Sequence, residues 1–165
     1  MSKKVAYYGI FAALAVLMGY VEFVLPSPVP IQGVKLGLAN VIVVIAMYFM
    51  GVKSALAISV VRVIMSSLLF GGFSGFLYSI AGALVSFGAM CIVKKIKAVS
   101  IIGVSIVGGI FHNIAQITVA ALVLNTKGVF YYLPVLLISG VITGIIIGLI
   151  SKYCLAHIEK RRIKI

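Results

Sequence analysis

The stretch LPVLLISGVITGIIIGLI, residues 133–150, contains no charged side chain. Its length is close to the roughly 20 apolar residues that an α-helix needs to cross a bilayer. Comparable apolar runs recur along the whole chain, separated by short polar, glycine-rich or proline-rich segments. They predict membrane helices over about residues 5–25, 36–51, 54–70, 74–93, 100–124 and 130–153. We therefore predict an all-α integral membrane protein whose single domain, residues 1–165, is a six-helix transmembrane bundle.

The composition argues against a water-soluble domain. Of the 165 residues, 64% are hydrophobic and only 10% are charged, and the mean hydropathy is +1.31. Soluble proteins carry about 25% charged residues, so this chain could not cover its exterior in water, and lipid is the solvent that fits. The first apolar run follows Lys3 and Lys4. It is too long for the apolar core of a signal peptide, and we interpret it as the first membrane helix.

Positive charge is distributed unevenly along the chain. The sequence has 14 Lys and Arg residues against two acidic residues, and its formal net charge is +12. With the N-terminus inside, only Lys35 and Lys127 fall on outer segments and Arg62 falls within a helix, while the other basic residues fall on inner segments. This asymmetry follows the positive-inside rule, which explains the net positive charge without a nucleic-acid partner. We expect a multi-pass protein of the cytoplasmic membrane with both termini in the cytoplasm.

Two charged side chains fall within predicted membrane helices, Glu22 in the first and Arg62 in the third. A charge at the centre of a bilayer costs at least ~2.5–3.5 kcal/mol on insertion scales, so both should face the bundle interior or a partner. At 1.5 Å per residue, Arg62 lies roughly 12 Å from the cytoplasmic end and Glu22 roughly 25 Å. A direct pair would require Arg62 to extend outward, and bonds to helix carbonyls or polar side chains are the alternative. Both residues are candidates for gating or counter-charge roles.

The predicted fifth helix carries a stripe of polar residues in the segment GGIFHNIAQ, 108–116. Gly109, His112 and Gln116 repeat at a helical spacing that places them on one face, and Asn113 lies beside them. Interhelical hydrogen bonds, each worth ~1 kcal/mol or less, are one explanation. The other is that His112, Asn113 and Gln116 line a ligand site, because several polar groups converge at similar depth.

The outer face carries a second candidate feature. Three predicted helices begin there, and helix N-termini attract anions through free N–H groups and the helix dipole. Lys35, the glycine-rich segment GGFSG at 71–75 and several aromatic residues lie at the same level. They suit an anionic ligand with a flat ring, although an interfacial aromatic belt with ordinary turns is the competing interpretation. The candidate contacts on this face are Lys35, Asn40, Ser74, Gly75 and Tyr78.

The sequence lacks the residues that several kinds of catalytic and metal site require. The chain has no Asp, which argues against an aspartate-rich metal–diphosphate centre, and residues 51–54 lack the spacing of a phosphate-binding Walker loop. Neither a Ser–His–acid set nor a cysteine pair with metal-ligand spacing is present. We therefore expect no catalytic residue, no metal and no resident cofactor, and a function other than that of an enzyme.

Three segments in this order resemble the Gx transporter family, also labelled heptaprenyl diphosphate synthase component I. They are GVKLGLANVIVVIAMYFMG (33–51), RVIMSSLLFGGFSGFLYSIAG (62–82) and GGIFHNIAQ (108–116). The resemblance implies a bundle similar to the substrate-binding S components of energy-coupling factor transporters. It also implies a transported cargo of the flavin type, FMN or FAD, for redox proteins outside the cytosol. An isoprenoid or quinone precursor as cargo, and a non-catalytic accessory subunit of heptaprenyl diphosphate synthesis, are the alternatives.

The partner that would energise transport is less defined. S components present a stripe of the AxxxA type on their first helix to a coupling protein, and here the nearest matches are Gly9/Ala13 and Ala15/Gly19. The departure from that pattern leaves two partners open: an energy-coupling module, or a second copy of the chain in a homo-oligomer. Glycines on one stripe of the last predicted helix could form such an interface or pack inside the bundle; they are Gly140, Gly144 and Gly148.

Overall fold

The computed structural model describes residues 2–25 and 37–161, and this part of the chain is helical with no strand, as predicted. A one-turn π-helix, η1, joins α3 to α4, and a 3₁₀-helix, η2, precedes α6. The elements are α1 (Ser2–Val24), α2 (Asn40–Phe49), α3 (Val52–Ser66), η1 (Ser67–Gly71), α4 (Gly72–Lys94), α5 (Ile101–Val123), η2 (Lys127–Tyr132) and α6 (Leu133–Lys160).

Four segments within the described residues have the length and apolar composition that a bilayer crossing requires: Val5–Val24, Val52–Lys94, Ile101–Val123 and Lys127–Lys160. The second of these contains 43 residues, roughly 65 Å of helix, which is about twice the thickness of the hydrocarbon core. It is divided at Gly72, whose φ of +62° interrupts the helical conformation between η1 and α4. The chain therefore has the segments of a multi-pass helical membrane protein.

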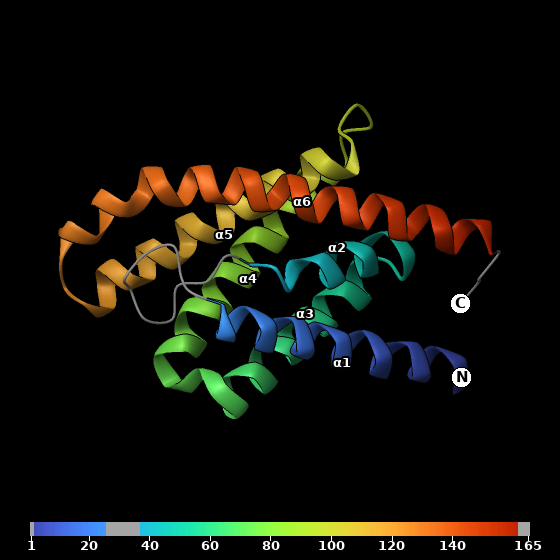
Figure 1. The fold of residues 1–165 in the computed structure, drawn as a ribbon, viewed down its shortest axis with the longest axis horizontal. Coiled ribbons are helices and arrows are strands. Elements are labelled where there is room, and N and C mark those ends of the chain that lie inside the picture. Colours follow the sequence, from blue (N-terminus) through green and yellow to red (C-terminus); the bar gives the residue numbers. More distant parts are fainter. Residues whose placement is uncertain (1, 26–36, 162–165) are drawn as a thin grey trace.

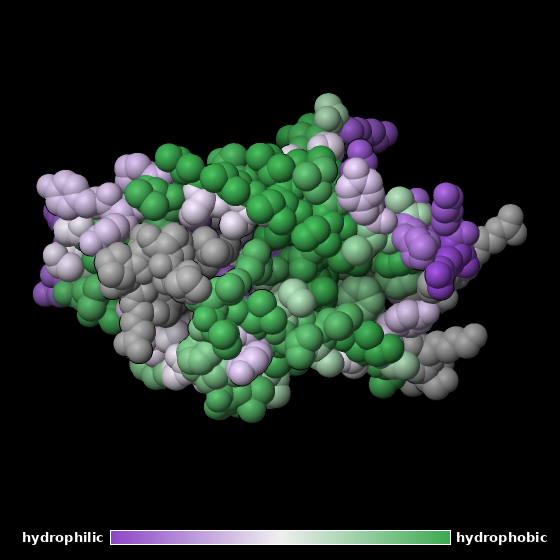
Figure 2. Space-filling model, viewed as in Figure 1, coloured by the Kyte–Doolittle hydropathy of each residue, from purple (hydrophilic) through white to green (hydrophobic). Residues whose placement is uncertain are grey.

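Helices α1 and α6 run along the long axis of the bundle, and the first residues of α1 and the last residues of α6 lie at the same end of the molecule (Figure 1). On the surface an apolar band occupies the middle, and hydrophilic residues gather towards the two ends (Figure 2). Many large apolar side chains are exposed, for example those of Ile92 and Ile138. A surface of this kind suits lipid rather than water.

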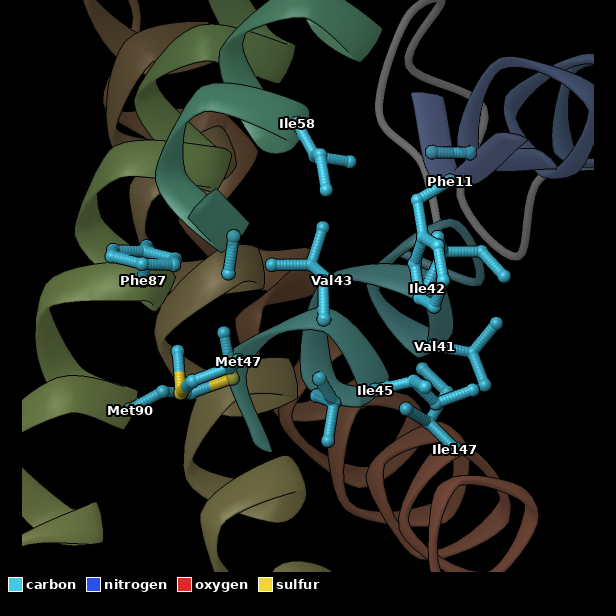
Figure 3. Packing of buried hydrophobic residues seen from close by; sticks show 14 of the residues in the cluster. Phe11, Val41, Ile42, Val43, Ile45, Met47, Ile58, Phe87, Met90 and Ile147 are labelled. Atoms are coloured by element: carbon cyan, nitrogen blue, oxygen red, sulfur yellow. The ribbon is translucent and has the colours of Figure 1, made fainter. Parts of the chain in front are cut away.

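The short helix α2 forms the centre of the bundle. Eight of its ten residues are buried, and it packs against α1, α3 and α6. Figure 3 shows Met47 beside Met90 of α4, and Val41 and Ile45 near Ile147 of α6. Ten residues extend only ~15 Å, about half of the hydrocarbon core. The helix begins at Asn40 rather than at residue 36, because Gly37 has a φ of +83° and starts a turn instead of a helix.

Glycines hold α5 and α6 in close contact. A Cβ added to Gly144 would lie 2.5 Å from the Cα of Ile106, and one added to Gly148 would lie 2.6 Å from the Cα of Ile102. Gly140 faces Gly109 and the side chain of Asn113 in the same interface. The glycine stripe of α6 is thus used for packing within the bundle, which leaves it unavailable for the homo-oligomer interface considered above.

The two small-residue pairs of α1 have different surroundings. Ala15 is buried, and a Cβ added to Gly19 would lie 2.8 Å from Oγ of Ser66 on α3. Gly9 and Ala13 are exposed on the outer surface of α1. Of the two pairs considered for docking, Ala15/Gly19 is therefore internal and Gly9/Ala13 faces outward.

Candidate functional site

The first component of the site is the buried N-terminus of α2. The turn at Gly37 and Leu38 leads into the helix, with Asn40 N–H bonded to the Gly37 carbonyl at 2.9 Å. Backbone N–H groups require an acceptor when they are buried. For the two N–H groups of the turn before α2, that acceptor is the Glu22 carboxylate of α1, which receives hydrogen bonds from Gly37 N–H and, at 3.2 Å, from Leu38 N–H. A negative charge also complements the positive end of the helix dipole.

The second component is Arg62 of α3, which is only 6% exposed. Its Nη2 donates to Oδ1 of Asn40 at 3.5 Å, a long hydrogen bond, and its charge is attracted by that of Glu22. Its Nε has no hydrogen-bond partner among the described residues. A guanidinium group carries five N–H donors, so this one keeps most of its bonding capacity unused. Of the two alternatives for Arg62, the structure has the bond to a polar side chain, that of Asn40, and the charge of Glu22 attracts the guanidinium group.

The third component is His112 of α5, which lies between two glycines. A Cβ added to Gly37 would be 3.2 Å from Cδ2 of His112, and one added to Gly82 of α4 would be 2.7 Å from its Cε1 and Nδ1. The same Cβ on Gly82 would be 3.1 Å from Cγ of Gln116. The imidazole therefore connects the start of α2 with α4, and Gln116 lies one turn further along the same face.

Asn113 serves a different interface. Its Nδ2 donates to the carbonyl of Leu136 at 2.6 Å and approaches Oγ of Ser139 at 3.5 Å, both on α6. This is the interhelical hydrogen bonding weighed for the polar stripe of α5. The stripe thus divides into His112 and Gln116, which face α4, and Asn113, which faces α6.

The candidate residues of the outer face differ in their burial. Tyr78 and Gly75 are buried on α4, one and two turns from Gly82, whereas Ser74 is exposed. Ser74 is eight residues from Gly82, roughly 12 Å along the helix, and Gly82 marks the level at which α2 begins. Lys35 lies outside the described residues. The start of α2 is therefore deeper than an outer vestibule, and the N–H groups of the turn that leads into it are already bonded to Glu22.

Lys94 was not predicted to belong to this arrangement. Its Nζ donates to the carbonyl of Met47 at 2.7 Å and lies 4.4 Å from the centre of the Tyr48 ring. The C-terminal end of α2 is therefore bonded to a cation, as its N-terminal end is bonded to a carboxylate. The sequence carried a signal for this: Lys94 begins a run of lysines at the end of a membrane helix, and lysine is favourable near helix C-termini.

The described residues contain no group of three or more His, Cys, Asp or Glu side chains that could hold a metal ion. What they do contain is a polar layer deep inside an apolar bundle, made of one carboxylate, one guanidinium, an imidazole and amides. Its members are Glu22, Asn40, Arg62, His112 and Gln116, each at most 6% exposed.

Apolar helices around a buried polar layer define a multi-pass helical membrane protein. The family described as heptaprenyl diphosphate synthase component I matches residues 11–154, and the chain belongs to this family. The match confirms the resemblance to the Gx transporter family noted in the sequence. Neither a curated protein nor a solved structure matches the chain.

Proposed function

We propose that this chain is a membrane transport protein, or the substrate-binding subunit of one, for a small anionic molecule with a planar ring. The observation that carries the proposal is Arg62, a buried guanidinium group that makes one long hydrogen bond, to Asn40, within the described residues. A buried charge is costly unless paired, and ionisable residues inside a membrane bundle mark substrate or ion pathways. Arg62 is best suited to a carboxylate or a phosphate, which its planar donors bind in pairs.

The short helix α2 supports the same proposal. In many membrane transporters, helices that are interrupted near the middle of the bilayer direct their N-termini at anionic substrate groups. We place the N-terminus of α2 at such a depth, because the helix is buried in the bundle and its first residue, Asn40, is bonded to Arg62. His112 and Gln116 of α5 and Tyr78 of α4 supply amide, imidazole and phenol groups near this level for the remainder of the ligand. Asn113 is outside this group of candidate contacts, because its side-chain amide holds α5 against α6.

Within this class, a flavin nucleotide, FMN or FAD, is our first candidate for the cargo, moved across the cytoplasmic membrane for redox proteins outside the cytosol. It combines an anionic phosphate with a flat ring, and the resemblance of the chain to its family directs the choice. We further propose six membrane crossings, with α3 and α4 crossing separately and α2 crossing together with the residues before it. The termini and the exposed lysines Lys53, Lys95 and Lys97 would face the cytoplasm.

Binding of FMN and riboflavin to protein purified in detergent tests the proposal, because the two molecules share the ring and differ by the phosphate. We expect FMN to raise the melting temperature, and R62Q to weaken FMN binding by about tenfold or more while changing riboflavin binding little. Arg161 is exposed at the end of α6, so R161Q is the matched control and should bind FMN as wild type does. Protein that lacks a flavin chromophore and is not stabilised by FMN or FAD contradicts the flavin proposal.

A coupling partner is proposed for the transporter as well. The exposed pair Gly9/Ala13 would contact either an energy-coupling module or a second copy of the chain. Gly9→Leu should disrupt such a contact without disturbing the bundle, because no described atom lies within 4 Å of a Cβ at Gly9. Native mass spectrometry of the wild type and this variant would reveal the change in stoichiometry, and identical stoichiometry would exclude this surface.

The description of the family favours a second candidate, a non-catalytic membrane subunit that recruits a soluble prenyl diphosphate synthase. Its docking surface would be the basic residues at the cytoplasmic end, of which Lys95, Lys97 and Lys160 are exposed. Lys94 belongs to that run but is bonded to Met47. Co-purification with a soluble synthase that is lost in a K95E/K97E variant, together with no flavin binding, would favour this candidate over transport.

A further inference from the structure

We infer that Glu22 is an internal competitor of the ligand: its carboxylate occupies the place at the start of α2 that the ligand's anionic group takes when it binds. This inference rests on the proposed function only in assuming that the ligand carries an anionic group. It assigns to Glu22 a role opposite to that of a ligand contact, because removing its charge should strengthen binding.

The hydrogen bonds of Glu22 show what it occupies. Its Oε1 accepts from the backbone N–H groups of both Gly37 and Leu38, two successive donors of the turn that leads into α2 and lies at the positive end of its dipole. The side chain comes from α1, fifteen residues away in sequence from Gly37, and is 6% exposed. A carboxylate thus already occupies the most favourable anion position near α2.

Arg62 shows why a second anion belongs at the same place. It is attracted by the charge of Glu22, yet its hydrogen bond goes to Asn40, the first residue of α2, and its Nε is unbonded within the described chain. These free donors indicate that Glu22 balances the charge of Arg62 without using its hydrogen-bonding groups. An incoming phosphate or carboxylate can bind them in pairs, which Glu22 does not do.

The two anions would oppose each other. With Glu22 ionised and bonded to the α2 N-terminus, an anion on Arg62 lies close to a like charge in a site of low dielectric, where such repulsion is strong. Binding therefore requires the Glu22 carboxylate to withdraw or to take up a proton. Release of Glu22 from Gly37 and Leu38 would free the start of α2, so ligand binding and movement of α2 would be coupled.

Pyrophosphate tests this without assuming a particular cargo, because it supplies the anionic group with no ring. Melting temperatures are measured in detergent over a pyrophosphate series, with chloride added to keep the ionic strength constant. For E22Q we expect half-maximal stabilisation at a concentration about tenfold lower than for wild type, the effect of removing one nearby like charge. R62Q and the double variant E22Q/R62Q should show no saturable stabilisation.

Glu159 is exposed on α6, so E159Q removes the same charge elsewhere and should respond as wild type does. The inference is overturned if E22Q requires as much pyrophosphate as wild type or more. Should E22Q fold poorly, E22D takes its place, because its shorter side chain draws the carboxylate away from Gly37. We expect E22D to reach half-maximal stabilisation at a pyrophosphate concentration below that of wild type by less than tenfold. A concentration equal to that of wild type overturns the inference. Absence of flavin binding with the expected pyrophosphate pattern would overturn only the flavin proposal.

Discussion

His112 of α5 lies directly against Gly82 of α4, so that a Cβ added to Gly82 would come within 2.7 Å of Cε1 and Nδ1 of the imidazole. Real Cβ atoms do not approach other atoms so closely. At the opposite edge of the ring, a Cβ added to Gly37 would lie 3.2 Å from Cδ2 of His112. The position of His112 is therefore determined by two glycines on two other segments of the chain. Since α2 begins beside Gly37, a change at Gly82 should reach the anion site as well as the packing of the bundle.

We predict that Gly82→Ala destabilises the protein by about 1–3 kcal/mol, the usual cost of overpacking a filled interior. It should also weaken FMN binding, because His112 must shift towards the start of α2. Gly88 is the matched control on the same helix, since no described atom lies within 4 Å of a Cβ there. Gly88→Ala should be neutral or stabilise by up to about 1 kcal/mol, as alanine favours the helix over glycine. Equal melting temperatures for G82A and G88A would contradict the described position of His112.

Lys94 is predicted to stabilise the bundle through the C-terminal end of α2. Substitution by Met keeps the length of the side chain but removes the charged hydrogen bond to Met47 and the contact with Tyr48. We expect K94M to lower stability by about 1–2 kcal/mol, the upper range for a cation at a helix C-terminus. Lys95 is exposed, so K95M should remain within about 0.5 kcal/mol of wild type. Unfolding in a denaturing detergent measures the stability of both variants. Equal losses of stability would exclude a stabilising bond between Lys94 and the C-terminal end of α2.

Close packing of α5 on α6 leads to a third prediction. At Gly144 the nearest atoms to an added Cβ are the backbone of Ile106 and of Ser105, which cannot move as a side-chain end can. Gly144→Ala should therefore separate the two helices and cost about 1–3 kcal/mol, more than the propensity gained. Gly88→Ala again serves as control. Unchanged stability of G144A would show that α5 and α6 are further apart than described.

Much of the fold could be predicted from sequence because it depends on local pattern. Apolar runs predicted helices in every place where the structure has one, and the polar residues Glu22, Arg62, His112 and Gln116 are all buried as their cost in lipid requires. Composition and spacing also excluded a soluble chain. These properties depend on each segment alone and on its solvent.

The start of α2 and the partners of its ends could not be predicted in the same way. Glu22 bonds to a backbone N–H fifteen residues later, and Lys94 to a carbonyl 47 residues earlier, and neither distance follows from a helical period. The sequence predicted three helix N-termini at one outer level, whereas α2 begins deeper, beside Gly82. Likewise, the direction of the glycine stripe of α6, towards α5 rather than outward, depends on which helices pack together.

Membrane orientation gives a last prediction. Lys127 of η2 and Lys97 after α4 are both exposed, and the proposed topology places them on opposite sides of the membrane. Single cysteines at these positions, in a background where Cys91 and Cys154 are replaced by Ser, should differ in their reaction with a thiol reagent that does not cross membranes. We expect Lys127→Cys to react in intact cells and Lys97→Cys to react only after permeabilisation. Reaction of both from outside would show that α5 does not place Lys97 and Lys127 on opposite sides of the membrane. The reverse pattern would invert the orientation and place the basic end outside, against the positive-inside rule.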